Sequence, residues 1–515
     1  MWEGGLGLDG HEAADVGTGL GGPPLWITTE QWMEVDWKDQ KARRGSRAAG
    51  LVGRQSKVRT KRALASVEKQ KGAGNLLRVG DNIQGETFEI FVEKLLRVQA
   101  DVERVFLLIR AADAASAMQR LEHEILGKEL FKALKEKHGD GFQSFARSKL
   151  WPVAGDIVHE NLGIQDSNLV NKLFKEVQII VNVAATTNFS YVSGTERSGL
   201  IPEKRLSMGE TLRSGSNSCY LDIEAEIDLV EKKKVELQAD HNLTPLAQKL
   251  AMKELGMQRA RFFGWPNTYV FTKAMGEMVL GHSRGNLPLV IVRPSIITSI
   301  LRDPLPGWIE GIRTIDIFMM AYANRKLQSF PGDPQMTVDL IPGDMVVNAM
   351  MATTVAHSKQ QSEFIYHVGS STRNPITYDS LLQCWFDYFS MNPRTGKDGT
   401  PLKITTKMNP SIRTTFLIMV YKFLLQVLGL IHFITCGFIF GRLYDDLNRK
   451  YKYLKLLIDL FEPYTFFKGR FDDANLEKLR AMMGKEEMLF DMDSKHIEWN
   501  SYLHGIHIPG ILKYE

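Results

Sequence analysis

Short apolar runs alternate with longer stretches of mixed polarity through the middle of the chain. Three of these runs have the length and composition of buried β-strands, namely residues 104–110, 177–184 and 287–292. The stretches 114–137 and 224–261 are instead helical in composition. Because strands that alternate with helices build a parallel sheet between two helical layers, the pattern predicts an α/β fold with a doubly wound parallel sheet.

The polarity pattern changes in the last quarter of the chain, where residues 416–440 are mostly apolar. The longest part of this segment without a charge, Phe423 to Phe440, has 18 residues. A helix that crosses a bilayer needs about 20 apolar residues, so the segment is borderline. We expect it to lie on a membrane surface or to be re-entrant, and a buried core helix and a true membrane span remain as alternatives.

The first 75 residues show weak periodicity and are rich first in glycine and then in basic residues. Between Lys38 and Arg78 there are thirteen Lys and Arg residues and two acids. We expect a disordered tail here. A transit peptide, a membrane-surface arm and a segment that is not native coding sequence are the alternatives, and the acids before residue 16 argue against a transit peptide.

Composition and charge set the general class of the protein. The 515 residues are 44% hydrophobic and 24% charged, and the net charge is +4, which gives no indication of nucleic-acid binding. The three cysteines, Cys219, Cys384 and Cys436, are far apart, which fits a reducing compartment and provides neither a disulfide framework nor a zinc site. We expect three parts: an extension over 1–75, a nucleotide-binding reductase domain over 76–375 and a mainly helical domain over 376–515.

The segment Gly264 to Glu277, GWPNTYVFTKAMGE, carries the clearest chemical signal. It places Tyr269 and Lys273 four residues apart at the start of a predicted helix, so that both side chains lie on one face. A lysine beside a tyrosine favours the phenolate and lowers the tyrosine pKa from its ordinary value of about 10. Such a phenol can give a proton to a carbonyl oxygen while hydride reaches the carbon.

The Tyr-x-x-x-Lys pattern also arises by chance as a pair on a helix surface, so its context matters. A strand that ends in Asn182 to Ala185 precedes it, and the strand closed by Arg293 and Pro294 follows it. Ligands of doubly wound sheets bind beyond the carboxyl ends of the strands. This order therefore favours a Rossmann-like, dinucleotide-binding sheet over an accidental pair.

From Phe91 onward the sequence resembles the alcohol-forming fatty acyl-CoA reductases of plants, the male-sterility type, which are extended members of the short-chain dehydrogenase/reductase superfamily. The matching segments occur in a consistent order: FVEKLLRVQADVERVFLLIRAADAASAMQRL, ENLGI, AATTNF, ERSGLI, DIEAE, GWPNTYVFTKAMGE, LPLVIVRPSIITS, PGWIEGIRTID, IPGDMVVNAM, IYHVGSS, DLNRK and FKGRFDD. The resemblance implies NADPH-dependent reduction of long-chain fatty acyl-CoA through the aldehyde to the primary alcohol, for wax- or suberin-type lipids. It also implies an intracellular location at the cytoplasmic face of the endoplasmic reticulum, with a plastid as the alternative.

The resemblance also assigns roles to individual residues. Tyr269 is implied as the proton donor, and Lys273 as the residue that lowers its pKa and holds the nicotinamide ribose. The implied cofactor-binding residues are Gly85, Arg110, Asp156, Asn182, Ala184, Lys273 and Pro294. Arg110 would meet the adenosine phosphate and Asp156 the adenine edge, Asn182 and Ala184 would line the cofactor, and Pro294 would shape the nicotinamide pocket. The alternatives are ordinary structural ones: a surface arginine, a loop-capping aspartate, a buried strand end and a strand stop.

The chain departs from this family in two places. Family members carry a glycine-rich loop before the helix that matches FVEKLLRVQ, whereas here only Gly85 falls on a family glycine. Asp81, Glu86 and Glu89 bring negative charge toward this phosphate-binding region, which should weaken phosphate binding.

The second departure lies after Phe189, where a helix and a strand ending in Ser-Thr-Ala-Tyr-Val are missing. Ser190 and Ser193 are the nearest hydroxyls, but neither stands in the family position. A βαβ unit takes about 30 residues, so the sequence predicts an incomplete sheet. Exon loss, a misassembled gene model and a degenerate paralogue would all produce this pattern. The rival functions are a catalytically impaired relative that keeps lipid or partner binding, and a reductase of a soluble substrate, against which the apolar segment argues.

Overall fold

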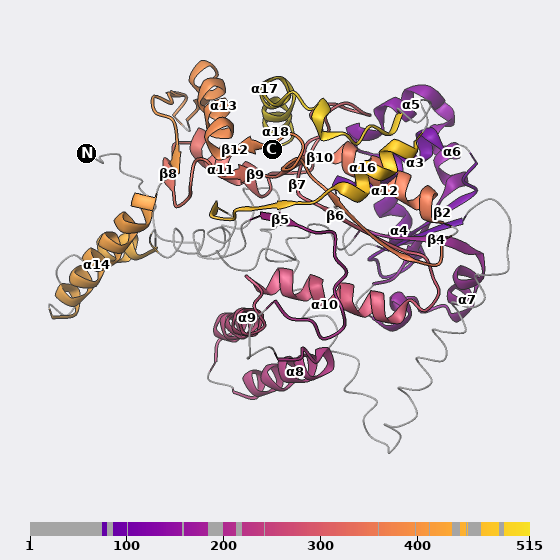
Figure 1. Cartoon of the computed structure of the whole chain (residues 1–515), viewed down its shortest axis with the longest axis horizontal. Helices are drawn as coiled ribbons and strands as arrows, with labels where there is room; N and C mark the ends of the chain where they lie inside the picture. The colour runs from indigo at the N-terminus through magenta and orange to yellow at the C-terminus, as the bar shows by residue number, and fades with distance from the viewer. Residues whose placement is uncertain are drawn as a thin grey trace.

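The computed structural model describes residues 75–79, 86–99, 101–156, 159–183, 199–212, 219–240, 243–358, 360–396, 398–410, 412–434, 443–449, 451, 465–483 and 489–515. The predicted N-terminal tail, Gly85, Ala184 and the two serines Ser190 and Ser193 lie outside these residues. Figure 1 shows the whole chain, with the early strands and helices gathered on one side and α14 on the other.

Four parallel strands form the larger sheet, in the order β3 (Leu150–Ala154), β2 (Arg104–Ile109), β1 (Asn75–Val79) and β4 (Val177–Asn182). The strands predicted at 104–110 and 177–184 are confirmed as β2 and β4. β1 and β3 were not predicted, and β1 occupies the centre, where it pairs with both β2 and β4.

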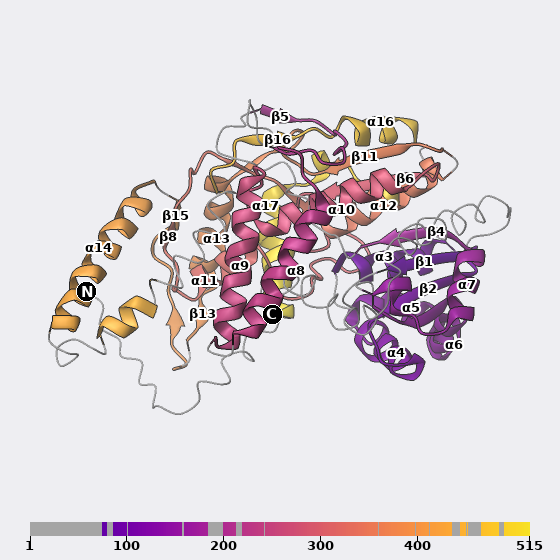
Figure 2. The ribbon, with the colours of Figure 1, turned by 90° about the horizontal axis from the view of Figure 1, so that it is seen from below.

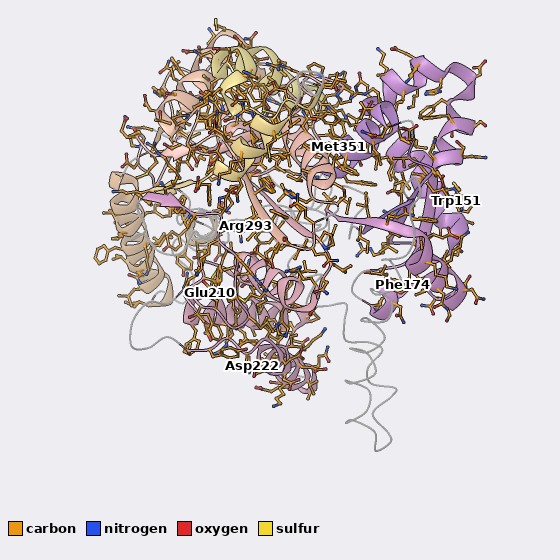
Figure 3. The ribbon with its side chains drawn as sticks, turned by 45° about the vertical axis from the view of Figure 1, so that its right-hand side comes forward. Trp151, Phe174, Glu210, Asp222, Arg293 and Met351 are labelled. Atoms are coloured by element: carbon orange, nitrogen blue, oxygen red, sulfur yellow. The ribbon has the colours of Figure 1, made fainter. Side chains whose placement is uncertain are left out.

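Helices cover the two faces of this sheet unequally. The first face packs against α3 (Glu86–Val98), α4 (Ala114–Arg120), α5 (Lys132–His138) and α6 (Phe142–Lys149) in a cluster that includes Leu107, Phe131 and Val181. The second face packs against α7 (Ser167–Glu176) at the β2 and β3 side. On the β4 side Ile180 is 58% exposed. Figure 3 shows Trp151 and Phe174 on the outer side of the same sheet.

A second set of strands continues the fold. β6 (Leu289–Pro294) pairs in parallel with β11 (Glu363–Val368), and β7 (Ile296–Thr298) pairs with β10 (Leu340–Pro342). The strand predicted at 287–292 is confirmed, but it extends through Arg293 and Pro294, which pair with His367 and Val368. Within the residues that the structure describes, no strand pairs with both β4 and β6, and residues 184–198, which contain the second sequence departure, lie outside the description.

One helix, α12 (Gly343–His357), connects the two sets of strands. It packs on α3 on one side and on β6 on the other. Met351 of α12 belongs to the apolar cluster of the four-stranded sheet and lies toward that sheet in Figure 3. The packing of α12 therefore holds the two strand layers together where direct strand pairing is interrupted.

The helices that carry the candidate chemistry lie beneath the second set of strands. α8 (Ile223–Ala239) and α9 (Pro245–Phe262) confirm the helical stretch predicted over 224–261, and α10 (Thr268–Ser283) follows them. Figure 1 shows α10 between the strand layer of β6 and the pair α8 and α9. Asp222 and Thr244 cap α8 and α9, which fixes where these two helices begin.

The last part of the chain is mainly helical, as predicted. Among the described residues of this part, the α-helices include α13 (Tyr378–Met391), α14 (Ile412–Ile434), α16 (Ala474–Met482), α17 (Trp499–Tyr502) and α18 (Ile508–Tyr514), and residues 443–449 are also helical. The largest apolar cluster unites Val346 and Tyr366 with Leu503 and Ile508, so residues on both sides of position 375 share one core. In Figure 2, α14 stands away from this core.

Candidate active site

A fixed turn between α9 and α10 sets the position of the predicted proton donor. Gly264 has a φ of 87°, which only glycine adopts without strain. The amide of Trp265 donates to the carbonyl of Ala260 at 2.8 Å, which closes α9 with a Schellman motif. Asn267 then caps α10, because its side-chain oxygen accepts from the Val270 amide at 3.0 Å. Tyr269 therefore lies in the first turn of a helix whose start is fixed on both sides.

Tyr269 and Lys273 lie on one face of α10, as their spacing predicts. The Lys273 Nζ is 5.7 Å from the centroid of the Tyr269 ring. Both residues are half-buried, and Tyr269 packs against the apolar cluster that contains Phe263 and Trp265. The Tyr269 ring therefore has both apolar neighbours and an ammonium group near it, and a nearby positive charge favours the phenolate form.

Three of the predicted cofactor residues meet at the carboxyl edge of the four-stranded sheet. Arg110 follows β2, Asp156 follows β3 after one intervening glycine, and Asn182 is the last residue of β4. The register pairs Ile109 with Ala154 and Val79 with Asn182, so these ends lie side by side. The structure thus brings Arg110, Asp156 and Asn182 to one edge, where doubly wound sheets bind their ligands.

The turn after Asp156 is unusual in its backbone. Asn161, Leu162 and Gly163 have φ angles of 55°, 62° and 64°, and a leucine in this region is uncommon. The amide of Asp156 donates to the carbonyl of Leu162 at 2.7 Å, which holds the turn against the aspartate. Backbone strain of this kind concentrates at functional sites. Sequence reasoning noticed the segment ENLGI but missed its conformation.

The first turn of α3 contains the two acids that the sequence places near the phosphate region. Glu86 is 5% exposed, and its carboxyl lies against Gly343, where an added Cβ would be 3.4 Å from Oε1. Burial raises the pKa of Glu86 well above its ordinary value, although Arg313 opposes this effect. Glu89 is fully buried and pairs with Lys128 at 2.5 Å. The structure therefore favours the neutral form of the Glu86 carboxyl, and the Lys128 ammonium balances the negative charge of Glu89. Both carboxyl groups are buried. The negative charge near the phosphate-binding region is therefore smaller than the sequence alone suggested.

Pro294 lies apart from the three strand-end residues. It ends β6 and lines a small hollow. The other residues that line this hollow are Arg293, Ser295, His367, Val368, Gly369 and Phe471. Pro294 therefore ends a strand that pairs with β11, whereas Arg110 and Asn182 lie at the ends of strands of the four-stranded sheet, and its role in a nicotinamide pocket stays a prediction.

The described residues fit an NAD(P)-type dinucleotide at its two ends. A guanidinium at a strand end, as in Arg110, suits a phosphate, and the half-buried ammonium of Lys273 suits a ribose hydroxyl beside the phenol. Gly85 and Ala184, the remaining predicted cofactor residues, lie outside the described residues.

Comparison with known proteins identifies the family. Two family models described as male sterility protein match residues 89–350 and 421–515, and the first is an NAD-binding model. A probable fatty acyl-CoA reductase 4 of Arabidopsis thaliana is 43% identical over 477 residues, which cover 84% of this chain and 96% of that protein. The chain belongs to the fatty acyl-CoA reductases of the male-sterility family.

Other relatives of this reductase agree. The fatty acyl-CoA reductase 1 of Arabidopsis thaliana is 42% identical and covers 82% of this chain and 94% of its own length. The alcohol-forming fatty acyl-CoA reductase of Simmondsia chinensis is 41% identical and covers 84% and 95%. Among solved structures, the reductase domain of a non-ribosomal peptide synthetase from Mycobacterium tuberculosis is 16% identical with a TM-score of 0.48, over 88% of this chain and 95% of that chain.

Proposed function

We propose that this reductase uses NADPH to reduce long-chain fatty acyl-CoA through the aldehyde to the primary alcohol, for wax- or suberin-type lipids. The observation that carries the proposal is the contact of Lys273 with the ring of Tyr269 in a chain that belongs to this family. The relative from Simmondsia chinensis is named as alcohol-forming, which supports the second reduction step.

In the proposed mechanism, Tyr269 donates a proton to the substrate carbonyl oxygen, and the Lys273 ammonium stabilises the phenolate that remains. NADPH supplies the hydride when it is bound. Collapse of the reduced thioester breaks the C–S bond and releases CoA as the thiol, which leaves an aldehyde. For the second reduction a second NADPH would supply hydride to the aldehyde carbon, and Tyr269, reprotonated from solvent, would donate a proton to the aldehyde oxygen to give the alcohol. Arg110 would hold the adenosine phosphate, Asp156 the adenine edge and Lys273 the nicotinamide ribose.

We further propose that α14 associates with a membrane surface, at the cytoplasmic face of the endoplasmic reticulum. Large apolar side chains are exposed along one broad face of the helix: Met419, Val420, Phe423, Leu424, Val427, Leu430, Ile431 and Ile434. A helix with one broad, exposed apolar face suits the plane of a membrane surface, where that face is buried in lipid and the opposite face stays in water. Within the described part of the chain, no helix is long and apolar enough to cross a membrane. An in-plane helix is therefore the arrangement that we favour.

The proposal is tested with the full chain, palmitoyl-CoA or stearoyl-CoA, and NADPH or NADH. We expect fatty alcohol, detected by gas chromatography, with NADPH preferred. Tyr269→Phe should reduce the rate by on the order of 10²-fold or more, since it removes the proton donor but keeps the ring. Alcohol formation at the wild-type rate in Tyr269→Phe contradicts the role of Tyr269, and absence of product from the wild type contradicts the proposed function.

A second candidate is a relative that has lost turnover and keeps lipid binding. It is favoured by the absence from the sequence after Phe189 of the helix and serine-bearing strand of the family, and by the exposure of Ile180 on β4. A cofactor that binds the folded state raises its thermal stability. A thermal shift with NADPH therefore separates the candidates: the active enzyme is stabilised, and the impaired relative is not.

A further inference from the structure

A buried ion pair joins α10 to the end of β6. Arg293 is 3% exposed and Glu277 is 7% exposed. The Arg293 Nε donates to Oε2 of Glu277 at 3.2 Å, and its Nη2 donates to Oε1. Figure 3 shows Arg293 at the strand layer, above the helices. Two parallel hydrogen bonds fix direction as well as distance, so the pair constrains how α10 is oriented against the strand.

The rest of the guanidinium is also held. Its Nη2 donates to the carbonyl of Lys204 at 3.0 Å, and its Nη1 donates to Nε2 of His367 at 3.1 Å. The Nδ1 of His367 lies 2.9 Å from the carbonyl of Asp472. Burial, together with Arg293, lowers the pKa of His367 to about 3, so the ring is neutral, with Nδ1 as donor and Nε2 as acceptor. Arg293 therefore has no freedom to follow a movement of α10.

The position of the pair relates it to the candidate site. Tyr269, Lys273 and Glu277 follow one another at four-residue spacing and form one stripe along α10. Arg293 is next to Pro294 at the end of β6. The distance along the helix from Tyr269 to Glu277 is about 12 Å. A clamp at Glu277 thus sets both the rotation and the axial position of the helix that carries the proton donor.

We propose that Glu277 and Arg293 are positioning residues of the reductase, which hold the stripe of Tyr269 and Lys273 at a fixed place relative to the end of β6. This inference rests on the proposed function. Neither residue takes part in proton transfer. A displacement of about 1 Å between reacting groups can reduce a rate by on the order of 10²-fold, so a clamp of this kind acts on kcat.

The test uses a double variant, because a single substitution would leave a buried charge without its partner and could unfold the protein. Glu277→Leu with Arg293→Met replaces both charges by apolar groups of similar size. We expect a moderately lower melting temperature, because the Lys204 carbonyl and Nε2 of His367 lose their donor. We expect a folded protein with a kcat lower by on the order of 10–100-fold and a KM for acyl-CoA within about threefold. Arg293→Lys keeps the charge but loses the fork, and we expect an intermediate kcat.

A matched control comes from a similar ion pair in the neighbouring helices. Arg259 of α9 donates to Glu226 of α8 through Nε at 2.7 Å and Nη2 at 2.5 Å. Glu226→Leu with Arg259→Met removes this pair without touching α10 or β6. The control should keep the wild-type kcat. Equal losses of kcat in both double variants, or a wild-type kcat in the Glu277 and Arg293 variant, would overturn the inference.

Fluorescence of bound NADPH separates this inference from the proposed function. If the wild type binds NADPH but does not reduce acyl-CoA, the proposed function fails. The positioning role is then tested by comparing the fluorescence emission of bound NADPH in the two double variants. In that case a change of emission in the Glu277 and Arg293 variant, and not in the control, supports the inference, and unchanged emission contradicts it. If the wild type does not bind NADPH at all, both proposals fail together.

Discussion

Lys273 follows Tyr269 by one turn of α10, and its ammonium nitrogen lies 5.7 Å from the centroid of the phenol ring. The ammonium can stabilise the phenolate that remains after proton transfer. We expect Lys273→Met to lower kcat by on the order of 10²-fold, and Lys273→Arg to retain more activity because the positive charge is kept. Steady-state kinetics with NADPH and acyl-CoA check this. Equal kcat values for the two variants would contradict an electrostatic role for the residue.

Two neighbouring residues of β4 differ in how far their side chains are exposed, and this difference shows which face of the strand is covered. Ile180 is 58% exposed and Val181 is 9% exposed, because adjacent residues of a strand point to opposite faces. We expect Ile180→Ala to change the free energy of unfolding by about 0.5 kcal/mol or less, and Val181→Ala to lower it by about 1–3 kcal/mol. Urea denaturation measures both. A cost of about 2–4 kcal/mol at Ile180 would mean that further structure covers this face of β4.

Local patterns in the sequence were sufficient for some elements of the fold and not for others. The apolar run of β2 and the four-residue spacing of Tyr269 and Lys273 are local signals, and the structure confirms both. β1 has the short sequence NLLRV, and its strand conformation depends on pairing with β2 and β4, which are distant in the sequence. No local pattern could distinguish it from the basic segment that precedes it.

The candidate site shows the same limit. The family resemblance named Arg110, Asp156 and Asn182, and the structure places all three at the carboxyl ends of strands of one sheet, while their contact with a cofactor stays a prediction. It did not indicate the pair of Glu277 and Arg293, which are sixteen residues apart and meet only through packing of α10 on β6. A charged residue at the end of an otherwise apolar strand was the available signal, since such a charge needs a buried partner.

Glu203 predicts a pH dependence of stability. Its carboxylate accepts from the amides of His367 and Asn475 at 2.9 and 2.8 Å. Burial nevertheless raises its pKa from 4.5 to about 7, and Asp472 and Asp473 add to the effect. Because the folded state holds the proton more tightly than the unfolded state, this contribution to stability is complete below about pH 4.5 and is lost as the pH rises through about 7.

The variant Glu203→Gln cannot titrate and isolates this contribution. We expect the difference in free energy of unfolding, wild type minus Glu203→Gln, to fall by on the order of 1–3 kcal/mol between pH 4.5 and pH 8, with allowance for solvent screening of a half-buried group. Urea denaturation of both proteins across this range measures it. Parallel stability curves would show that the carboxyl titrates at its ordinary pKa.

The exposed side chains of α14 allow a direct test of membrane association. Phe423 and Leu430 are 63% and 58% exposed, so Phe423→Asp with Leu430→Asp should leave the melting temperature nearly unchanged. Burial of each such side chain in lipid contributes about 1.5–3 kcal/mol, so we expect binding to phosphatidylcholine and phosphatidylethanolamine vesicles to fall at least about tenfold in a sedimentation assay.

Leu246 and Leu250 of α9 are exposed to a similar extent and provide the control. Leu246→Asp with Leu250→Asp should bind vesicles as the wild type does. Equal loss of vesicle binding in both double variants would show that the apolar surface of α14 is not the specific contact. If the wild type stays in the supernatant, the proposal that α14 associates with a membrane is wrong.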